Sequence, residues 1–407
     1  MPSTVLSGIR VLDLSRVLAA PLAAQLLGDL GAEVVKIERP KRGDESRGYG
    51  PPFLHDADGQ PTDDAAFFLA CNRNKRSVTV DLAKPEGQAI IRRLAAQSDV
   101  VIENFKTGGL ARYGLDFESL KAVNPRLVYC SVTGYGQTGP MATRPGYDGV
   151  FQAMSGFMNV SGHPDDVPGG GPMKVGISIV DILTSLYAAN AIQAALYHRD
   201  MRSGRGQHID MSLLDCGLAS LSHFAMNYLV SGEIPERRGN GGFGGVPSQA
   251  FQCRDRQIFL VAGGDAHFRA MCEAIGRPDL PDNPLFNSTS ARIENRRQLV
   301  QALDAVFIDR DAREWLDRLE AAGVPASPVN TIAEALEEPQ IVHREMVRRL
   351  DHPVGPIRIL ANPIAFSETP VGDYAPPPLL GQHTDEVLNE LGVSTHEREA
   401  LRASGVI

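Results

Sequence analysis

The stretch IRVLDLSRVLAAPLAAQLLGDLGAEVVKI, residues 9–37, decides the fold class of this chain. Residues 9–14 are aliphatic and β-branched enough for a buried strand, and residues 22–30 repeat apolar side chains with helical spacing. Gly31 closes that helix, and residues 33–37 predict the next strand. A strand, a helix and a second strand in this order indicate a βαβ unit of a parallel sheet.

The same alternation continues through the N-terminal half. Further strands are expected over 77–82, 100–103 and 127–133, with a helix after Pro85. This pattern predicts a doubly wound, Rossmann-like α/β unit. Beyond it, expected strands at 248–252 and 258–262 and helices at 266–275 and 291–307 predict a smaller α+β unit.

A chain of 407 residues is long enough for two or three packing units. We expect a large Rossmann-like domain over 1–200, a linker over 201–225 and a small α+β domain over 226–327. An extended linker over 328–378 should follow, because residues 351–378 are rich in proline and lack helical periodicity. Residues 379–407 should form C-terminal helices that complete the large domain.

Composition excludes several classes of function. The net charge of −9 argues against nucleic-acid binding. The five cysteines form no Cys-x-x-Cys pair and the histidines are scattered, so neither disulfides nor a metal site are expected. The chain shows no leader pattern and no apolar run near the length of a membrane span, so we expect a soluble, cytoplasmic protein without a membrane partner.

The first expected turn between strand and helix, residues 15–21, contains no glycine. Backbone could therefore not approach a pyrophosphate as in dinucleotide-binding folds, and a nicotinamide or flavin cofactor is not expected. A formal G-x-G-x-x-G occurs at Gly239, Gly241 and Gly244, but it precedes a strand and not a helix. A nicotinamide dehydrogenase is thus disfavoured.

Basic residues nevertheless gather in three short segments of the first third of the chain. These clusters are Lys36, Arg39, Lys41 and Arg42; Arg73, Lys75 and Arg76; and Lys106 and Arg112. Several convergent cations would suit one polyanionic small molecule.

Asp181 lies in apolar sequence, where a strand-like run is expected to give way to a helix over 182–197. One interpretation is a plain helix N-cap, because aspartate is among the favoured capping residues. The other is a nucleophile, which the free amides and dipole of the helix would hold ionised in a partly dry site. The two interpretations are compatible.

The segment 238–248 is unusually rich in glycine. It predicts either a flexible surface loop or a mobile lid that closes over a site and excludes water.

Several motifs in order resemble the class III CoA-transferases, also called the CaiB/BaiF or formyl-CoA transferase family, over essentially the whole chain. The motifs that carry the resemblance are Val11-Leu-Asp-Leu-Ser15 with Ala20-Pro21, Gly28 to Arg39, Asn72-Arg-Asn-Lys-Arg-Ser77, Val101-Ile-Glu-Asn-Phe105, Gly134-Tyr-Gly-Gln-Thr-Gly-Pro140, Gly204-Arg-Gly-Gln207 and Pro378-Leu-Leu-Gly-Gln-His-Thr384.

The resemblance implies that Asp181 is the nucleophile and that the glycines at 241, 242, 244 and 245 belong to a lid loop. It implies no permanently bound cofactor, with coenzyme A entering as an acyl-CoA substrate. The residues that match CoA contacts are Arg16, Val17, Leu18, Ala19, Arg39, Asn72, Lys75, Asn104, Phe105 and Arg112, while Tyr147 and Asp148 match the substrate pocket. Pro145 stands where the formyl-CoA enzyme has a lysine, with Arg144 beside it.

The implied reaction passes through an aspartyl mixed anhydride and an aspartyl-CoA thioester. Residues 134–147 look most like members that move CoA between dicarboxylates, so the expected donor is succinyl-CoA and the expected acceptor a small dicarboxylate. The family also implies a ring-like chain with long linkers that interlocks as a homodimer. The alternatives are an α-methylacyl-CoA racemase, whose Gly-His-Asp motif here reads Gly146-Tyr-Asp148, and a non-catalytic CoA-binding protein.

Overall fold

The computed structural model describes residues 4–56, 58–242 and 244–407. They form two compact units. The larger unit comprises the described residues up to 158 together with 174–233 and 342–407, and the smaller unit comprises 159–173 and 234–341.

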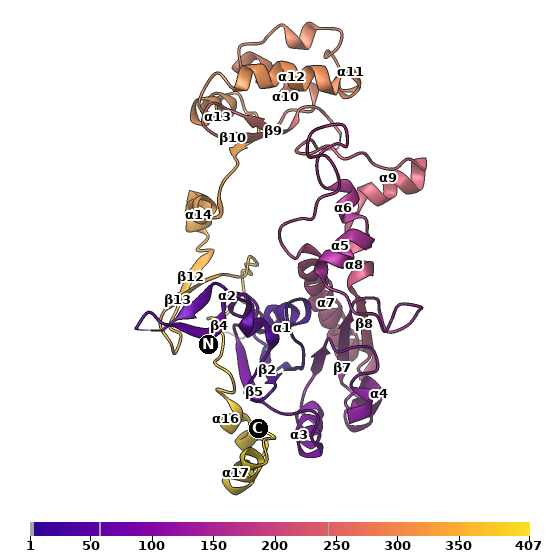
Figure 1. The fold of residues 1–407 in the computed structure, drawn as a ribbon, viewed down its shortest axis with the longest axis vertical. Helices are drawn as coiled ribbons and strands as arrows, with labels where there is room; N and C mark the ends of the chain where they lie inside the picture. The colour runs from indigo at the N-terminus through magenta and orange to yellow at the C-terminus, as the bar shows by residue number, and fades with distance from the viewer. Residues whose placement is uncertain (1–3, 57, 243) are drawn as a thin grey trace. The chain divides into compact units, whose positions relative to one another are not determined.

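A six-stranded parallel sheet forms the centre of the larger unit (Figure 1). Its strands are β1 (Arg10–Asp13), β2 (Glu33–Glu38), β5 (Lys75–Thr79), β6 (Val100–Glu103), β7 (Val128–Thr133) and β8 (His208–Ser212). They are ordered β5-β2-β1-β6-β7-β8, the doubly wound order of Rossmann folds. The order reverses between β1 and β6, and ligands of such sheets bind at that point, beyond the carboxyl ends of the strands.

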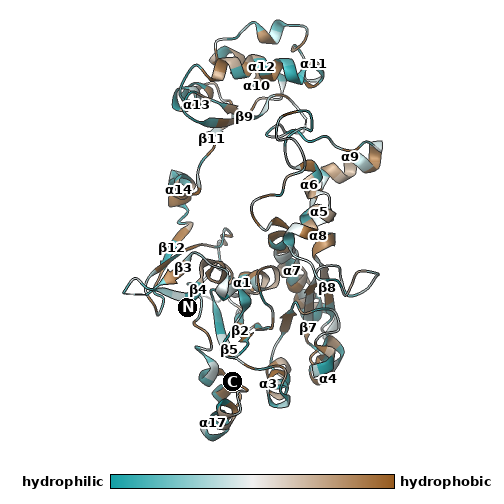
Figure 2. Cartoon of the chain, viewed as in Figure 1, coloured by the Kyte–Doolittle hydropathy of each residue, from teal (hydrophilic) through white to brown (hydrophobic). Residues whose placement is uncertain are grey.

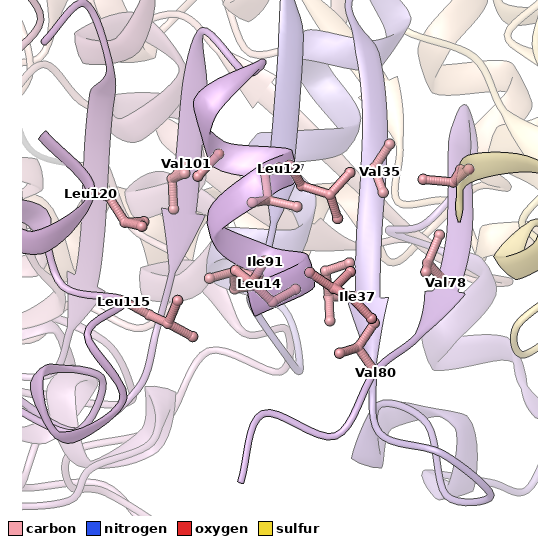
Figure 3. Close-up of a cluster of buried hydrophobic side chains, with 14 of the residues drawn as sticks. Leu12, Leu14, Val35, Ile37, Val78, Val80, Ile91, Val101, Leu115 and Leu120 are labelled. Atoms are coloured by element: carbon pink, nitrogen blue, oxygen red, sulfur yellow. The ribbon is translucent and has the colours of Figure 1, made fainter. Parts of the chain in front are cut away.

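Helices cover both faces of this sheet and bury two apolar clusters. On one face α3 (Pro85–Ala96) places Ile90, Ile91 and Leu94 against β1, β2 and β5, as Figure 3 shows for Ile91 beside Leu12 and Ile37. On the other face α1 (Ala19–Asp29) and α7 (Ile179–His198) pack against each other. The spacing of the apolar residues in α3 is helical, so one face of the helix is buried.

The C-terminal residues pack on the first of these clusters. Helix α16 (Thr384–Glu390) buries Val387 and Leu388, and Val406 beyond α17 (Thr395–Ala403) is 1% exposed. The backbone N–H of Asp81 donates to the carbonyl of Val406 at 2.7 Å. The C-terminal residues therefore complete the apolar cluster that strands β1 and β2 begin.

The larger unit contains several shorter elements besides these. They are 3-10 helices Glu45–Gly48 and Ala111–Tyr113; strands β3 (Phe53–His55), β4 (Pro61–Ala65), β12 (Val347–Leu350) and β13 (Ile357–Leu360); helices α2 (Ala66–Leu69), α4 (Phe117–Val123), α5 (Asp148–Met154), α8 (Leu213–Ser220) and α9 (His223–Ser231); and a π-helical turn, Arg199–Ser203. Helix α6 (Phe157–Val160) spans the boundary between the units.

The smaller unit is an α+β unit built on an antiparallel sheet of β9 (Ser248–Gln252), β10 (Gln257–Val261) and β11 (Ala326–Pro328). Its helices are α10 (Asp265–Ala274), α11 (Thr289–Glu294), α12 (Arg296–Phe307), α13 (Ala312–Ala321) and α14 (Ile332–Glu337), with a 3-10 turn at Leu280–Asp282 and α15 (Pro339–His343) at its end. Leu299, Leu303 and Phe307 line the buried face of α12, which has both hydrophobic and hydrophilic sides in Figure 2.

Three segments differ from the expected organisation. The expected linker 201–225 contains β8, the edge strand of the main sheet. Exposed residues alternate along β8, so the strand has no continuous apolar run by which it could be recognised. The expected linker 328–378 contains α14, α15 and the hairpin of β12 and β13. Residues 159–173 group with the smaller unit, because Gly239 donates to the Gly162 carbonyl at 2.9 Å and Arg237 pairs with Asp165.

Helix α7 with the turn after it, Ile179–Ser203, is long and apolar enough to cross a membrane by length and composition, with a mean hydropathy of 1.4. Eight of the helix's residues are buried, and it packs against α1 and β7. These contacts make it a core helix of the larger unit.

Candidate active site

A cavity of about 280 Å³ lies at the carboxyl ends of β1, β6 and β7, beside the point where the strand order reverses. All of its lining residues belong to the larger unit. They are Arg16, Val17, Leu18, Ala19, Glu45, Tyr49, Asn104, Phe105, Lys106, Thr107, Val132, Thr133, Gly134, Ala142, Thr143, Arg144, Pro145, Gly146, Tyr147, Asp181 and Leu213. The sequence-predicted nucleophile and the predicted turn 16–19 thus share one cavity.

A second cavity of about 310 Å³ adjoins the first and shares Arg16, Glu45 and Phe105 with it. Arg39 and Arg112, two of the predicted CoA contacts, line this second cavity, and both are exposed. The guanidinium of Arg16 lies over the Phe105 ring at 4.8 Å, at the place where the two cavities meet. An extended ligand could therefore reach from the arginines of the second cavity to Asp181 in the first.

Asn104 connects the two strand ends that form the floor of the site. Its side-chain carbonyl accepts from the Arg16 backbone N–H at 2.9 Å, and its amide donates to the Arg16 carbonyl at 2.6 Å. Both hydrogen bonds of the Arg16 backbone are thus supplied by one side chain on the neighbouring strand end, which fixes the turn after β1 to the end of β6.

Asp181 is the third residue of α7, which begins at Ile179, and the segment before the helix is irregular and not a strand. The prediction that Asp181 caps this helix is therefore wrong. Ser178, the N-cap residue just before the helix, makes no side-chain cap hydrogen bond either. Among the described residues, none donates a side-chain or backbone hydrogen bond to the Asp181 carboxylate, which is half-buried and lines the cavity.

Asp148 supplies the missing cap from another helix. It is the first residue of α5 and is 7% exposed, and one of its carboxylate oxygens accepts from the backbone N–H groups of Val180 at 2.8 Å and Asp181 at 3.3 Å. Gln152, one turn along α5, donates to the other oxygen at 2.5 Å and also accepts from Val175 N–H at 2.9 Å. The pair Asp148 and Gln152 therefore holds the segment that carries Asp181.

This arrangement raises the pKa of Asp181 to about 7. Burial is the main cause, and the negative charge of Asp148 adds to it. The expectation that helix amides would hold Asp181 ionised is contradicted, because those amides are bonded to Asp148 instead. A carboxylate with so little stabilisation is a better attacking group once it is deprotonated.

Other sequence-predicted residues lie away from the cavity linings. Lys75 is 3% exposed and its ammonium donates to Asp13, to the Pro21 carbonyl and to Asn72, each within 2.9 Å. Asn72 is fully buried as well. Lys36, from the first basic cluster, is 0% exposed and paired with Asp44 at 2.9 Å. The structure does not bring these three side chains to either cavity, because the two lysines neutralise buried carboxylates and Asn72 accepts a hydrogen bond from Lys75.

Tyr147 and Asp148, the predicted pocket residues, have different surroundings. Tyr147 lines the cavity at its open side and is 71% exposed, whereas Asp148 is not among the lining residues. Lys106 and Arg144, which sequence reasoning did not assign to the site, line the cavity with exposed side chains. Their position in loops after β6 and β7 is the signal that could have found them.

The glycines predicted to form a lid lie in the smaller unit, with Phe243 between them outside the described residues. Arg296 donates to the carbonyls of Gly242 and Gly244, both at 3.2 Å. Gly245 lies so close to Gly263 that a Cβ on it would stand 2.8 Å from the Gly263 Cα. Among the described residues, no group of three potential ligand side chains is arranged to hold a metal ion.

Known proteins with this architecture give the site a context. The family model described as CoA-transferase family III matches residues 6–384. The chain is 46% identical to a succinate–glutarate CoA-transferase of Agrobacterium fabrum, over 97% of each chain. It is 40% identical to a succinyl-CoA:glutarate CoA-transferase of Mus musculus, over 99% of this chain and 90% of the relative. A solved CaiB/BaiF family structure from Brucella suis has a TM-score of 0.85 at 44% identity, covering 95% of this chain and 99% of that one.

Proposed function

This chain belongs to CoA-transferase family III, and from that premise we propose that it moves CoA from succinyl-CoA to a small dicarboxylic acid with Asp181 as the covalent nucleophile. The donor and the acceptor class follow from the relatives, several of which are named for succinate or succinyl-CoA and a second dicarboxylate. The chain is an enzyme that uses CoA thioesters as substrates.

The observation that carries the assignment of the nucleophile is the position of Asp181. Its carboxylate lines the same cavity as the turn 16–19 and the pair Asn104 and Phe105, at the ligand-binding end of a parallel sheet. A CoA thioester whose phosphates contact Arg39 and Arg112 in the second cavity would bring its acyl group toward Asp181 in the first. Asn72 and Lys75 then act behind the site as supports of the buried charges.

The proposed reaction begins when an oxygen of the ionised Asp181 attacks the thioester carbonyl. A carbon–oxygen bond forms and the carbon–sulfur bond breaks, which gives an aspartyl succinyl anhydride and CoA thiolate. The thiolate attacks the aspartyl carbonyl, releases succinate and leaves an aspartyl-CoA thioester. The acceptor carboxylate attacks that thioester to form a new anhydride, and the thiolate then takes the new acyl group and frees Asp181.

Each of these intermediates reacts with water, so the site needs protection from solvent. We propose that the loop with Gly241, Gly242, Gly244 and Gly245 supplies it as a lid. Gly244 has a φ of +102° and open space around it, which permits a backbone rearrangement there. Arg296, bonded to two carbonyls of the loop, would anchor one position of the lid.

The distal carboxylate of a dicarboxylate needs a cation near the acyl group. Arg144 and Lys106 line the cavity of Asp181 and form no ion pair with any described residue, whereas Arg16 is paired with Glu45. We assign the distal carboxylate to Arg144 or Lys106 on this basis.

A racemase is the second candidate within the same superfamily, and the site disfavours it. That reaction needs an imidazole at the position of Tyr147, and the described residues lining the cavity include no histidine. The unperturbed pKa of a tyrosine lies about three units above that of histidine, so a phenol is a poor substitute for the proton shuttle.

We propose a homodimer as the functional form. Helix α9 exposes three large apolar side chains at helical spacing, with Met226 at 55%, Leu229 at 72% and Val230 at 81%. A patch of this kind marks a protein interface. Light scattering at micromolar concentration should give a dimer, and the double variant Leu229→Glu/Val230→Glu should give a monomer. A monomeric parent chain would refute the proposal.

The function is tested by incubating the protein with succinyl-CoA and glutarate and identifying the CoA esters by mass spectrometry. Glutaryl-CoA and free succinate in equal amounts are expected. Addition of hydroxylamine during turnover should convert Asp181 to its hydroxamate, which peptide mapping can locate. Hydroxamate at another residue would overturn the assignment of the nucleophile while leaving CoA transfer intact, and absence of any CoA-ester product would overturn the substrate assignment.

A further inference from the structure

The turn between β1 and α1 contains a strained residue at the wall of the cavity. Val17 has a φ of +73°, in the left-handed region that glycine occupies readily and that a β-branched residue avoids. Such a conformation persists only when the surrounding structure enforces it. Dinucleotide-binding folds place glycine in this turn, so this chain obtains a tight turn by another means.

A buried ion pair bonds to the backbone on both sides of Arg16, including the N–H of the strained residue, Val17. The Asp44 carboxylate accepts from the Val17 N–H at 3.1 and 3.3 Å, and it pairs with the Lys36 ammonium at 2.9 Å. Lys36 in turn donates to the carbonyl of Ser15 at 2.8 Å. The pair therefore connects the residues before and after Arg16 through one salt bridge, which is almost completely shielded from water.

The pair is itself held in place by further bonds. Ser46 donates to Asp44 through its backbone N–H at 2.9 Å and its hydroxyl at 2.8 Å. Burial by itself would raise the pKa of Asp44, but Lys36 and these backbone donors outweigh burial and hold the pKa well below its usual range. Asp44 is therefore held ionised, and these donors fix the position of its carboxylate.

We infer that the Lys36–Asp44 ion pair is a positioning device for acyl-CoA binding, which holds Val17 in its left-handed conformation and thereby sets Arg16 and the backbone of residues 17–19 against the ligand. The inference rests on the proposed acyl-CoA site. Neither side chain lines the cavity of Asp181, so neither takes part in the chemistry. Asp44 borders the second cavity, and both residues bond to the backbone of the turn.

The test is a rescue experiment. The double variant Lys36→Met/Asp44→Asn removes both charges without leaving either one unpaired, while the asparagine keeps the shape of the aspartate. KM for succinyl-CoA should rise about tenfold, with a smaller change in kcat, because the turn loses its geometry but Asp181 does not. Adding Val17→Gly should reverse at least about a third of the rise in log KM, because glycine adopts the positive φ without the ion pair.

Asp64→Asn is the matched control. Asp64 is also buried and paired with a buried cation, Arg47, but it forms no hydrogen bond or ion pair with the described residues of the turn. This variant should lower the unfolding midpoint without changing KM, and Val17→Gly should not alter its behaviour.

Two results would overturn the inference: an unchanged KM in the double variant, or a raised KM that Val17→Gly fails to lower. If the double variant folds but is too unstable for kinetics, the same coupling to Val17→Gly is measured in unfolding free energies by a double-mutant cycle, and a coupling of zero there would also overturn the inference. A parent protein that does not bind succinyl-CoA would instead refute the proposed function, so the two failures are distinguishable.

Discussion

Two carboxylates that border the adjoining cavities have opposite surroundings. The buried Asp44 lies 2.9 Å from the Lys36 ammonium, whereas the charged neighbour of the half-buried Asp181 is another carboxylate, Asp148. The pKa of Asp44 is lowered and that of Asp181 is raised to about 7. On the proposed function, the paired charge beside the β1–α1 turn holds the geometry of that turn, and the unpaired charge at the start of α7 supplies reactivity. The same fold would thus stabilise one acid that positions the turn and destabilise another that attacks the ligand.

The largest effect should come from removing the unpaired acid. Asp181→Ala should lower kcat by about 10⁴-fold or more, because no covalent intermediate can form. Product formation from succinyl-CoA and glutarate, followed by mass spectrometry, measures it. Asp44→Ala would lower activity only as far as it weakens binding or folding, so a larger loss of kcat there would break the comparison.

The same two acids should have opposite effects on stability. Because the folded pKa of Asp181 lies above its unfolded value near 3.8, the stability linked to this group is fully present below pH 4 and is lost as the pH rises through about 7. Asp181→Asn should therefore raise the unfolding free energy by about 2 kcal/mol at pH 8 and by less at pH 5. Urea unfolding at the two pH values checks this, and an equal effect at both would contradict the raised pKa.

Asp148→Asn should sharpen the comparison through the pH profile. Asparagine can still accept the Val180 N–H, so the cap remains while the charge beside Asp181 is lost. The acid limb of kcat/KM, expected near pH 7, should move down by about one unit or less. Asp148→Ala, which removes cap and charge together, should in addition lower the unfolding midpoint; a limb that stays near pH 7 in both variants would assign the raised pKa to burial alone.

Exposed cations should contribute less than these buried acids. Arg39→Ala and Arg112→Ala should each raise KM for succinyl-CoA about tenfold at low salt, with kcat unchanged and a weaker effect at high salt. Arg349→Ala is the matched control, since Arg349 is an exposed arginine on β12 that lines neither cavity. A comparable rise in KM for the control would make the effect one of overall charge.

The smallest effect is expected in the glycine loop of the other unit. Gly244→Ala meets no neighbouring atom, so its cost is confined to the positive φ, about 1 kcal/mol, and kcat should fall only a few-fold. Gly245→Ala meets the Gly263 backbone and should destabilise the smaller unit more. Equal kinetics for both variants and the parent would argue that the loop is no lid.

The parallel sheet was predictable because strands such as Val100–Glu103 are short apolar runs bounded by turn residues, and the structure places that strand on the same four residues. Motifs also singled out Asp181, which lines the cavity, but the interpretation of this residue as a helix cap was wrong. The true cap, Asp148, lies 33 residues away in another helix, and rules that read neighbouring residues cannot detect it.

Charge patterns were the least informative part of the sequence. Lys36 and Lys75 lie in the same short segments as Arg39 and Arg76, yet both lysines occupy buried positions of β2 and β5. There Asp44 neutralises Lys36 and Asp13 neutralises Lys75. Of the described residues in the basic clusters, Arg39, Lys106 and Arg112 line one of the two adjoining cavities. The charge of a side chain can be predicted from the sequence, but its ion-pair partner can be identified only from the folded structure.

The packing of Val387, Leu388 and Val406 against β5 and α3 has a consequence for biosynthesis. The smaller unit is mostly one continuous segment, 234–341, and it can begin to fold while the ribosome is still adding residues after it. The larger unit cannot, because its sheet keeps an uncovered apolar surface until α16 and α17 emerge. Nascent chains of this protein should therefore depend on chaperones through most of their synthesis, and a stop codon before residue 384 should produce insoluble protein.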